Sequence, residues 1–301
     1  MSVHSTEAHH TQPRLVIFGG TGFFGRAITA EARRRGIEVS VVSRGIRRDE
    51  ANRVSFGPHR IADVTRGETL NGTLREGDVV INLVGLSPLQ RPRGGRRSYY
   101  QVHTRGTINV VSEAVRAGAR GIVYVSALGV HRSCGAAYGE TKAMAEAAVT
   151  AAPIRSTVVA PSILYGPGSE IVAMLTGLSR LPIVPIPTIN APFRPIHVED
   201  AARLVVDTAV GSLKERYLPL VGPERLTAGE VAAHFLHARS TPTVSIPAPL
   251  SRPAIQLASR IKLPGAPADL APMLAIDNAG GPPPRGLRLQ RYTDWVSRSG
   301  T

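Results

Sequence analysis

A chain of 301 residues, 43% of them hydrophobic, can bury a full core without metals or disulfides, and its single cysteine, Cys134, excludes an intramolecular disulfide and suits a reducing cytoplasm. No apolar run reaches the roughly 18 residues of a membrane span, and residues 1–13 lack the apolar core of a signal peptide, so we expect a cytoplasmic protein with a disordered leader at 1–13. The net charge is +14, and only three of the 36 basic residues are lysines. The arginines are spread along the chain without a DNA- or RNA-reading motif, so nucleic-acid binding is not expected.

The first half of the chain alternates between short apolar runs and helical patterns. An apolar run of β-forming residues at 14–18 predicts a buried strand, and helical spacing over 23–35 follows it, with Gly36 at the usual place of a helix-ending glycine. Further strands are predicted at 38–43, 79–84, 122–126 and 157–160, and helices at 99–117 and 136–152. Alternating strands and helices predict an α/β fold with a doubly wound parallel sheet, the Rossmann type.

The pattern changes after Pro161. The segment 181–195 is apolar but contains five prolines, which exclude a regular helix or a central strand. A short helix is predicted to begin near Glu199, with Asp200 as its N-cap, and the last sixty residues look irregular. We therefore expect a Rossmann core over 14–160 and a small C-terminal substrate-binding lobe of the same domain over 161–301.

A glycine-rich segment follows the first predicted strand and opens the first predicted helix. Glycines at 19, 22 and 25 permit a tight turn, close approach to a pyrophosphate and close packing of the helix on the strand. The start of the helix offers free N–H groups to the phosphates. A glycine triplet alone also fits a structural turn, but here the strand, loop, helix and second strand all occur in order. They predict a dinucleotide site with the loop residues Gly19, Thr21, Gly22, Phe23, Phe24 and Gly25.

The residues after the second predicted strand bear on the choice of cofactor. Sites that select NAD place an Asp or Glu there for the ribose 2′-hydroxyl, whereas this chain has Ser43 and Arg44, with Arg47 and Arg48 close behind. A guanidinium can bind a 2′-phosphate through two parallel hydrogen bonds. Arginine is common throughout the chain, which weakens the argument, but the pattern favours NADP(H) over NAD(H).

Further cofactor contacts are expected where later strands end. Asp63 follows the third strand-like segment, where it would contact the adenine, and Asn82 ends the fourth strand. The additional cofactor-binding residues that we expect are Asp63, Val64, Leu83, Val84, Gly85, Lys142, Pro161 and Ile163.

Seven motifs occur in order between residues 14 and 225: GGTGFFG at 19–25, VINLVG at 80–85, VHTRGTINV at 102–110, YVSALG at 124–129, YGETK at 138–142, LYGPG at 164–168 and PIHVEDAA at 195–202. Together they resemble the short-chain dehydrogenase/reductase superfamily, in its atypical and extended branches. Within these branches the chain is most similar to the group that includes the nucleotide-binding accessory subunit of respiratory complex I and its bacterial relatives.

The resemblance implies a catalytic pair, Tyr138 and Lys142. The two residues are four apart in a predicted helix and so share one face. In the family the tyrosine gives a proton to the carbonyl oxygen while the nicotinamide gives hydride to the carbon. A neighbouring ammonium and the positive nicotinamide ring would lower the pKa of the phenol from its usual value near 10. Without the resemblance, the two residues would be an ordinary pair on a helix surface.

The third expected catalytic residue is Ser126. The family ends its fifth strand with two hydroxyl residues, of which the second polarises the carbonyl, but here Ala127 follows Ser126, as in the atypical branch. Ser126 is thus either a carbonyl donor or a strand end, and His131 or Ser133 could take its place. Other departures from the family pattern are His103, where extended members carry asparagine, and Ala160-Pro161, where many have Arg-Pro.

Two segments are candidates for the substrate side. Residues 85–100 suggest a lid whose arginines, Arg91, Arg93, Arg96 and Arg97, would either meet an acidic substrate or form a solvated loop. The proline-rich segment 181–195 would supply an apolar wall. The nine histidines are scattered, so no metal site is expected.

Three functions fit these patterns. The first is NADPH-dependent reduction of a ketone on a small, largely apolar molecule, such as a polyketide or another secondary metabolite, by a monomer or homodimer. The second is a non-catalytic NADP(H)-binding protein with a structural or regulatory role, which Ala127 favours and the Tyr138/Lys142 pair disfavours. The third is an NAD-dependent nucleotide-sugar epimerase or dehydratase, which Arg44 and Ala127 disfavour. Fold alone does not decide among them.

Overall fold

The computed structural model describes residues 12–45, 58–89, 94–132, 136–211, 213–251, 253–254, 276–281, 283 and 286–299. The expected leader falls almost wholly outside these ranges, as do Arg47, Arg48, Arg91, Arg93, Ser133 and Cys134. Among the described residues, no helix is both long enough and apolar enough to cross a membrane.

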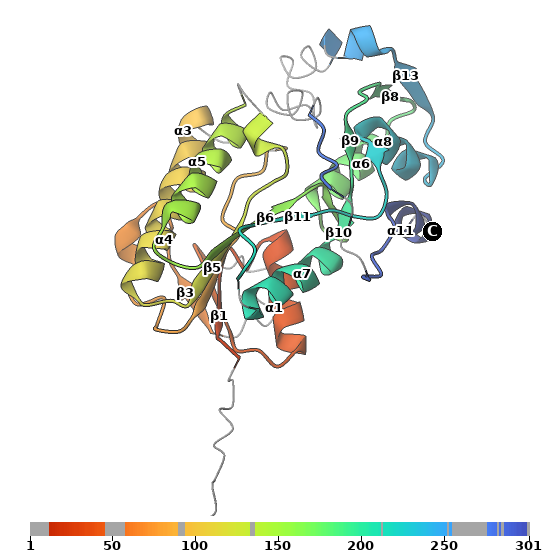
Figure 1. Cartoon of the computed structure of the whole chain (residues 1–301). Coiled ribbons are helices and arrows are strands. Elements are labelled where there is room, and N and C mark those ends of the chain that lie inside the picture. Colours follow the sequence, from red (N-terminus) through yellow and green to blue (C-terminus); the bar gives the residue numbers. More distant parts are fainter. Residues whose placement is uncertain are drawn as a thin grey trace, which may run out of the picture.

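Seven parallel strands form the central sheet, in the order β11-β6-β5-β4-β1-β2-β3 (Figure 1). Their bounds are β1 Leu15–Phe18, β2 Val39–Ser43, β3 His59–Ile61, β4 Val79–Asn82, β5 Gly121–Val125, β6 Ser156–Pro161 and β11 Tyr217–Leu220. The central strands are short runs of mainly Val and Ile that are buried on both faces, as a parallel sheet covered by helices requires. The predicted doubly wound sheet of Rossmann type is confirmed.

Helices cover both faces of this sheet. α1 (Phe23–Arg34) and α7 (Val198–Val210) pack against each other on one face. α4 (Gly106–Arg116) and α5 (Ala137–Ala151) lie on the other face (Figure 1). The result is a three-layer arrangement of helices, sheet and helices.

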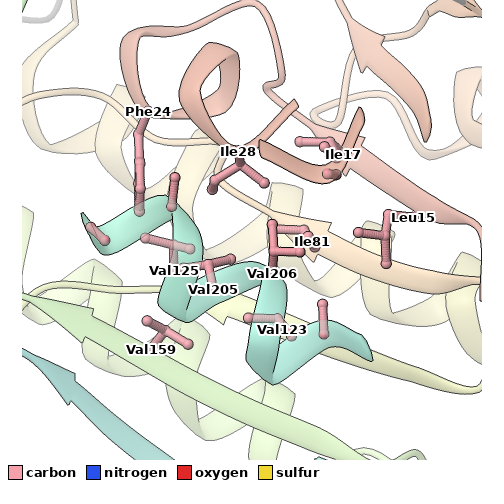
Figure 2. Packing of buried hydrophobic residues seen from close by; sticks show 14 of the residues in the cluster. Leu15, Ile17, Phe24, Ile28, Ile81, Val123, Val125, Val159, Val205 and Val206 are labelled. Atoms are coloured by element: carbon pink, nitrogen blue, oxygen red, sulfur yellow. The ribbon is translucent and has the colours of Figure 1, made fainter. Parts of the chain in front are cut away.

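The core is divided between the two faces by the alternation of side chains along each strand. Ile17 of β1 joins the cluster on the α1 side with Ile28 and Val205, whereas its neighbour Val16 joins the cluster on the α4 side with Val110. Figure 2 shows the first cluster, in which side chains of β1, β4, β5 and β6 meet those of α1 and α7. Each of these fully buried side chains contributes about 1.5–3 kcal/mol through the area that it removes from water.

The helix expected over 99–117 is present but is not uniform. It begins as α3 (Gly95–Tyr99), widens into a π-helical turn over Tyr100–Arg105 and continues as α4. The wide turn carries His103, whose buried ring bonds to residues outside this helix. Such turns are frequent at functional sites.

The C-terminal part adds small elements beside the sheet. The further elements are β7 Leu164–Tyr165, α6 Glu170–Leu178, β8 Val184–Pro187, β9 Pro192–Phe193, β10 Ile196–His197, β12 Leu226–Thr227, α8 Ala228–His237, β13 Thr243–Ile246 and α11 Tyr292–Ser299. The six strands among these elements form three two-stranded pairs, β10-β7, β12-β9 and β13-β8. The prolines of 181–195 lie in or beside short two-stranded pairs and not in a helix or a central strand. Within the described part of the last sixty residues, which were expected to be irregular, the structure forms β13 and α11.

The expected division at residue 160 needs correction. β11 pairs with β6 as the outermost strand of the main sheet, and α7 covers β4 and β5, so the sheet layer draws on residues up to 220. Both elements contribute apolar side chains to the core, such as Leu220 and Val205. The break in the sequence pattern at the prolines marks an excursion of the chain and not the end of the sheet.

The expectation for Asp200 is wrong. His197 is the N-cap of α7, and its Nδ1 accepts a hydrogen bond from the Glu199 N–H. Asp200 is the third residue of the helix and is buried, because its carboxylate pairs with Arg203 and accepts the N–H of Gln290 at 2.7 Å. It anchors the C-terminal segment to the core.

Candidate active site

The carboxyl edge of the parallel sheet gathers the residues singled out in the sequence. Gly19 follows β1, Ser43 ends β2, Leu83 follows β4, Ser126 follows β5 and Pro161 ends β6. Strand order reverses between β1 and β4, and ligands of such sheets bind in the crevice at this switch point. The segments that follow β1 and β4 are closely packed there, since a Cβ on Gly19 would lie 3.4 Å from both Leu83 and Val84.

The glycine loop has the geometry that its spacing predicts. Gly19 has φ +82°, a conformation that favours glycine. A Cβ on Gly25 would lie 2.4 Å from the carbonyl oxygen of Gly19 and 2.5 Å from the Cα of Gly20. Gly22 is the N-cap of α1, which therefore has no side-chain cap, and the first turn of the helix has no acidic residue. A compact loop and an uncapped helix N-terminus fit the pyrophosphate of a dinucleotide.

The ends of β2 and β3 bring Ser43, Arg44 and Asp63 to one corner of the site. Ser43 Oγ lies 2.9 Å from His59 Nε2, and Arg44 is exposed. The Asp63 carboxylate accepts the N–H and the hydroxyl of Thr65 at 2.9 and 2.8 Å. Burial opposes ionisation of Asp63, but these bonds and nearby arginines, including Arg44, outweigh it and lower its pKa. This corner combines a fixed carboxylate with an exposed cation.

The predicted strand 79–84 ends two residues early, at Asn82. The side-chain oxygen of Asn82 accepts the N–H of Val84 at 3.1 Å, and this local bond ends the strand. The chain then passes Gly85, where a Cβ would lie 3.4 Å from Lys142 Nζ and 3.5 Å from His103 Nε2. The end of β4 is therefore in contact with α5 and with the π-helical turn.

Tyr138 and Lys142 lie on the same buried face of α5, one turn apart. Lys142 Nζ donates to the carbonyl oxygen of Val125 at 2.8 Å and lies 5.1 Å from the centroid of the Tyr124 ring. Burial lowers the pKa of Lys142 to about 8, against the opposing charge of Glu146. The ammonium is thus held at the end of β5, beside Ser126.

The pKa of Tyr138 differs from the expectation. Burial raises it, and the nearby Tyr99 hydroxyl and Glu170 carboxylate add to the increase, whereas a lowering by Lys142 and by the positive ring of a bound nicotinamide was expected. The ring is enclosed by Tyr99 and His103, at centroid distances of 6.0 and 5.4 Å in edge-to-face geometry. Tyr99 was not expected beside Tyr138, because no signal in the sequence links these two residues on different helices.

Ser126 lies directly after β5 with its side chain buried. Its Oγ has no hydrogen-bond partner among the described residues. A buried hydroxyl without a partner costs stability, and the cost is offset if the hydroxyl serves a bound ligand. Of the two expected alternatives, a carbonyl donor fits this unpaired atom better than a bonded strand end.

His131 was a candidate to replace Ser126, and the structure gives it another partner. His131 Nε2 lies 2.6 Å from one carboxylate oxygen of Glu146, on the same helix as Lys142. The His131 side chain is largely exposed, whereas Glu146 is buried, and its second oxygen has no partner among the described residues. His131 therefore covers a buried carboxylate.

His103 holds three segments together beneath the site. Its Nε2 accepts the N–H of Leu86 at 2.8 Å, and its Nδ1–H donates to Thr141 Oγ1 at 2.9 Å. The Thr141 hydroxyl donates in turn to the carbonyl of Ala137 at 2.7 Å. Burial, and then the charge of Lys142, lower the pKa of His103 to about 3, so the ring is neutral at physiological pH.

This neutral histidine predicts a pH-dependent stability. Because the pKa falls from 6.5 in the unfolded chain to about 3 in the folded protein, the unfolded state binds the additional proton below pH 6.5. Stability is therefore complete above pH 6.5 and declines as the pH falls toward 3, by about 2 kcal/mol at pH 5 for this group. Denaturant unfolding at pH 5 and pH 8 measures the difference.

The matched variant is His103→Gln, which has no ionisable group. The variant is expected to be less stable than the wild-type protein at pH 8, but its loss of stability between pH 8 and pH 5 should be smaller by about 2 kcal/mol. An equal loss in both proteins would contradict a buried neutral His103. Exposed His237→Gln serves as the control and should keep the wild-type pH dependence.

The substrate side is described only in part. Arg96 pairs with Glu140, two residues beyond Tyr138 on α5, and Arg97 is exposed, whereas Arg91 and Arg93 lie outside the described residues. The segment 181–195 was expected to form an apolar wall of the substrate site. The buried side chains of β8, which lies in this segment, pack against α8.

Comparison with known proteins gives three kinds of match. Residues 15–209 match the model of the NAD dependent epimerase/dehydratase family. A ceramide reductase of Caulobacter vibrioides (strain NA1000 / CB15N) is 28% identical over 198 residues, which are 64% of this chain and 59% of that protein. The match thus spans about three-fifths of the relative's length.

Solved structures share the fold at low identity. The human epimerase family protein SDR39U1 (isoform2), solved with NADPH, matches with a TM-score of 0.73 and 20% identity over 95% of this chain and 98% of its own. The UDP-glucose 4-epimerase of Thermus thermophilus, solved with NAD, matches with a TM-score of 0.64 and 17% identity over 78% and 86% of the two chains. At these identities the similarity concerns the fold.

Proposed function

The chain belongs to the NAD dependent epimerase/dehydratase family, and on that premise we propose that it is an NADPH-dependent reductase of a ketone on a small, largely apolar molecule. Membership confirms the resemblance to the extended short-chain dehydrogenase/reductases and the expectation of a nicotinamide dinucleotide cofactor. The preference for NADPH, the ketone and the roles of individual residues are our proposals.

The observation that carries the proposal is the placement of Lys142 and Ser126 at the end of β5, with Tyr138 one turn from Lys142 on α5 and packed against Ala127. Tyr138 and Lys142 share the buried face of α5, Lys142 bonds to Val125, and the next residue, Ser126, has an unpaired buried hydroxyl among the described residues. A carbonyl needs a proton donor and a second hydrogen-bond donor at its oxygen. Tyr138 and Ser126 can supply these two donors.

The steps that these residues perform follow from their protonation states. Tyr138 keeps its proton at neutral pH because its pKa is raised, and it gives that proton to the substrate oxygen. Lys142, whose pKa is about 8, remains mostly charged and stabilises the phenolate that results. A bound NADPH supplies the hydride. The glycine loop, Ser43, Arg44, Asp63 and residues 83–85, with Pro161 and Ile163, would hold it.

An apolar substrate is supported by two features. The curated relative is named a ceramide reductase, and ceramides are lipids. In this chain, the part beyond β6 is rich in proline and aliphatic residues and holds few charges between Ile171 and Val198. A long-chain ketone is therefore a better first substrate than a nucleotide sugar. The single cysteine supports a reducing compartment such as the cytoplasm.

An epimerase or dehydratase of nucleotide sugars is the second candidate, because the matching family is named for those reactions. The exposed Arg44 after β2 and Ala127 after Ser126 argue against it. A non-catalytic dinucleotide-binding protein is the third candidate, and the Tyr138/Lys142 pair argues against it.

The test of function follows NADPH absorbance with long-chain ketones and, separately, the interconversion of UDP-sugars with NAD. Oxidation of NADPH that depends on the ketone and yields the alcohol supports the proposal. UDP-sugar turnover without ketone reduction would favour the second candidate. Tight cofactor binding with no turnover in either assay would favour the third.

The preference for NADPH is tested at Arg44. We expect NADPH to bind at least about tenfold tighter than NADH, a difference of about 1.4 kcal/mol, and we expect Arg44→Ala to remove the difference by weakening NADPH alone. Isothermal titration measures all four affinities. The control is Arg34→Ala, which removes an exposed charge at the far end of α1, and it should bind both nucleotides as the wild-type protein does. Equal wild-type affinities would refute the 2′-phosphate role of Arg44.

A further inference from the structure

The paired strands β8 and β13 form a two-stranded ribbon with unlike surroundings on its two faces. They run parallel, with Val244 opposite Pro185, and lie in the C-terminal part, away from β1 and β3 (Figure 1). Val184 and Ile186 of β8 are buried against Leu236 of α8. This helix covers the inner side of β8.

The outer face of the ribbon is apolar but exposed. Side chains alternate along a strand, so Pro185 of β8 points away from α8 and Val244 lies opposite it on β13, while Ile183 directly precedes β8. The Ile183 and Val244 side chains are 52% and 48% exposed. Leu181 before β8 and Leu250 after β13 are also large, apolar and exposed. We call these five residues, Leu181, Ile183, Pro185, Val244 and Leu250, the apolar face.

The segments that form the apolar face contain no acidic residue. Asp and Glu are absent from 171–198 and from 231–254. Exposed Arg180 precedes Leu181 directly, and the whole chain carries a net charge of +14. Aliphatic side chains in segments that carry arginine and no acidic residue are complementary to an apolar layer with a negative boundary.

We propose that the apolar face docks on the surface of a lipid bilayer that contains anionic lipids. Its aliphatic side chains enter the boundary between headgroups and acyl chains, and Arg180 contacts the anionic headgroups. A second copy of this chain is a poorer occupant, because a symmetric pair would bring two acid-free faces of strongly positive molecules together. The proposal goes beyond the reductase function and does not depend on it.

Sedimentation with vesicles tests the proposal on the full chain. We expect the protein to sediment with phosphatidylcholine vesicles that contain phosphatidylglycerol, to remain in solution with pure phosphatidylcholine, and to be released by salt. Ile183→Ser combined with Val244→Ser should reduce binding about tenfold or more. Arg180→Gln should reduce it to a smaller extent.

The control is Ile61→Ser combined with Val115→Ser, which replaces the same residue types at exposed positions on β3 and α4. It should bind vesicles as the wild-type protein does. Absence of wild-type binding to anionic vesicles, or an equal loss in both double variants, would overturn the proposal. Light scattering adds a third outcome that overturns it, a wild-type dimer that Ile183→Ser/Val244→Ser dissociates without any vesicle binding.

NADPH titration and the ketone assay separate the two proposals. Unchanged NADPH affinity in every variant shows that a loss of vesicle binding is not a loss of folding. Vesicle binding without ketone reduction would overturn only the proposed function, and ketone reduction without vesicle binding would overturn only the docking surface.

Discussion

Replacing Tyr138 by phenylalanine is expected to lower kcat for ketone reduction by a factor on the order of 10²–10⁴ and to leave NADPH affinity within a few-fold. The substitution removes one oxygen atom, which has no hydrogen bond to another described residue. The ring contacts with Tyr99 and His103 remain. The loss should therefore appear in the proton-transfer step and not in folding. Steady-state kinetics with a long-chain ketone, beside NADPH titration and a thermal melt, measures all three effects.

Tyr100→Phe is the matched control, because Tyr100 is exposed on the π-helical turn next to Tyr99. It should retain nearly full activity. If Tyr138→Phe kept more than half of the wild-type kcat, Tyr138 would not be the proton donor. If Tyr138→Phe lost NADPH binding as well, its role would be to shape the cofactor site.

Gly25→Ala is expected to abolish measurable NADPH binding and to destabilise the protein by about 1–3 kcal/mol or more. The added Cβ would lie 2.4 Å from the Gly19 carbonyl oxygen and 2.5 Å from the Gly20 Cα. Both atoms belong to the backbone, so no side chain can rotate away. α1 would have to move off the loop, and its N–H groups would leave the phosphate position. Isothermal titration and denaturant unfolding measure the two effects.

Gly177→Ala provides the control for the same chemical change. Gly177 lies in α6, where a Cβ meets nothing within 4 Å. Alanine is favoured over glycine in a helix by about 0.5–1 kcal/mol, so this variant should be unchanged or slightly more stable and should bind NADPH normally. Normal NADPH binding by Gly25→Ala would show that the loop can open at little cost and would remove the close packing of α1 as a requirement.

The local elements of the fold could be predicted because each has a local signal. β1, the glycine loop and α1 follow one another within a few residues, and the apolar pattern of each element indicates which of its faces is buried. The four-residue spacing of Tyr138 and Lys142 likewise places both on one face of α5, as the structure confirms. The strand predicted over 79–84 was too long, because the strand ends where the Asn82 side chain accepts a hydrogen bond from the Val84 N–H. The apolar pattern of the sequence gives no sign of such a hydrogen bond.

The errors concern partners that are distant in the sequence. Asp200 looked like a helix cap because it stands near a helix start, but its carboxylate binds Gln290, ninety positions later. The sheet was expected to end before residue 161, although β11 returns to pair with β6 after the proline-rich excursion. The pKa of Tyr138 was expected to fall because of Lys142 and the positive ring of a bound nicotinamide, whereas burial among other elements raises it.

By itself the sequence determined the fold class, the edge of the sheet that carries the candidate site and the spacing of the proposed catalytic pair, because these depend on apolar periodicity and on residues within one turn or one loop. Only the tertiary structure decided that His103 joins Leu86 to Thr141, that the hydroxyl of Ser126 is left unpaired among the described residues and that the outer face of the β8–β13 ribbon is exposed. The physical reason is that the apolar pattern of an element indicates which of its faces is buried, but not what packs against that face. The packing partner comes from segments far away in the chain, and it determines the solvation and the pKa of the groups between the two elements.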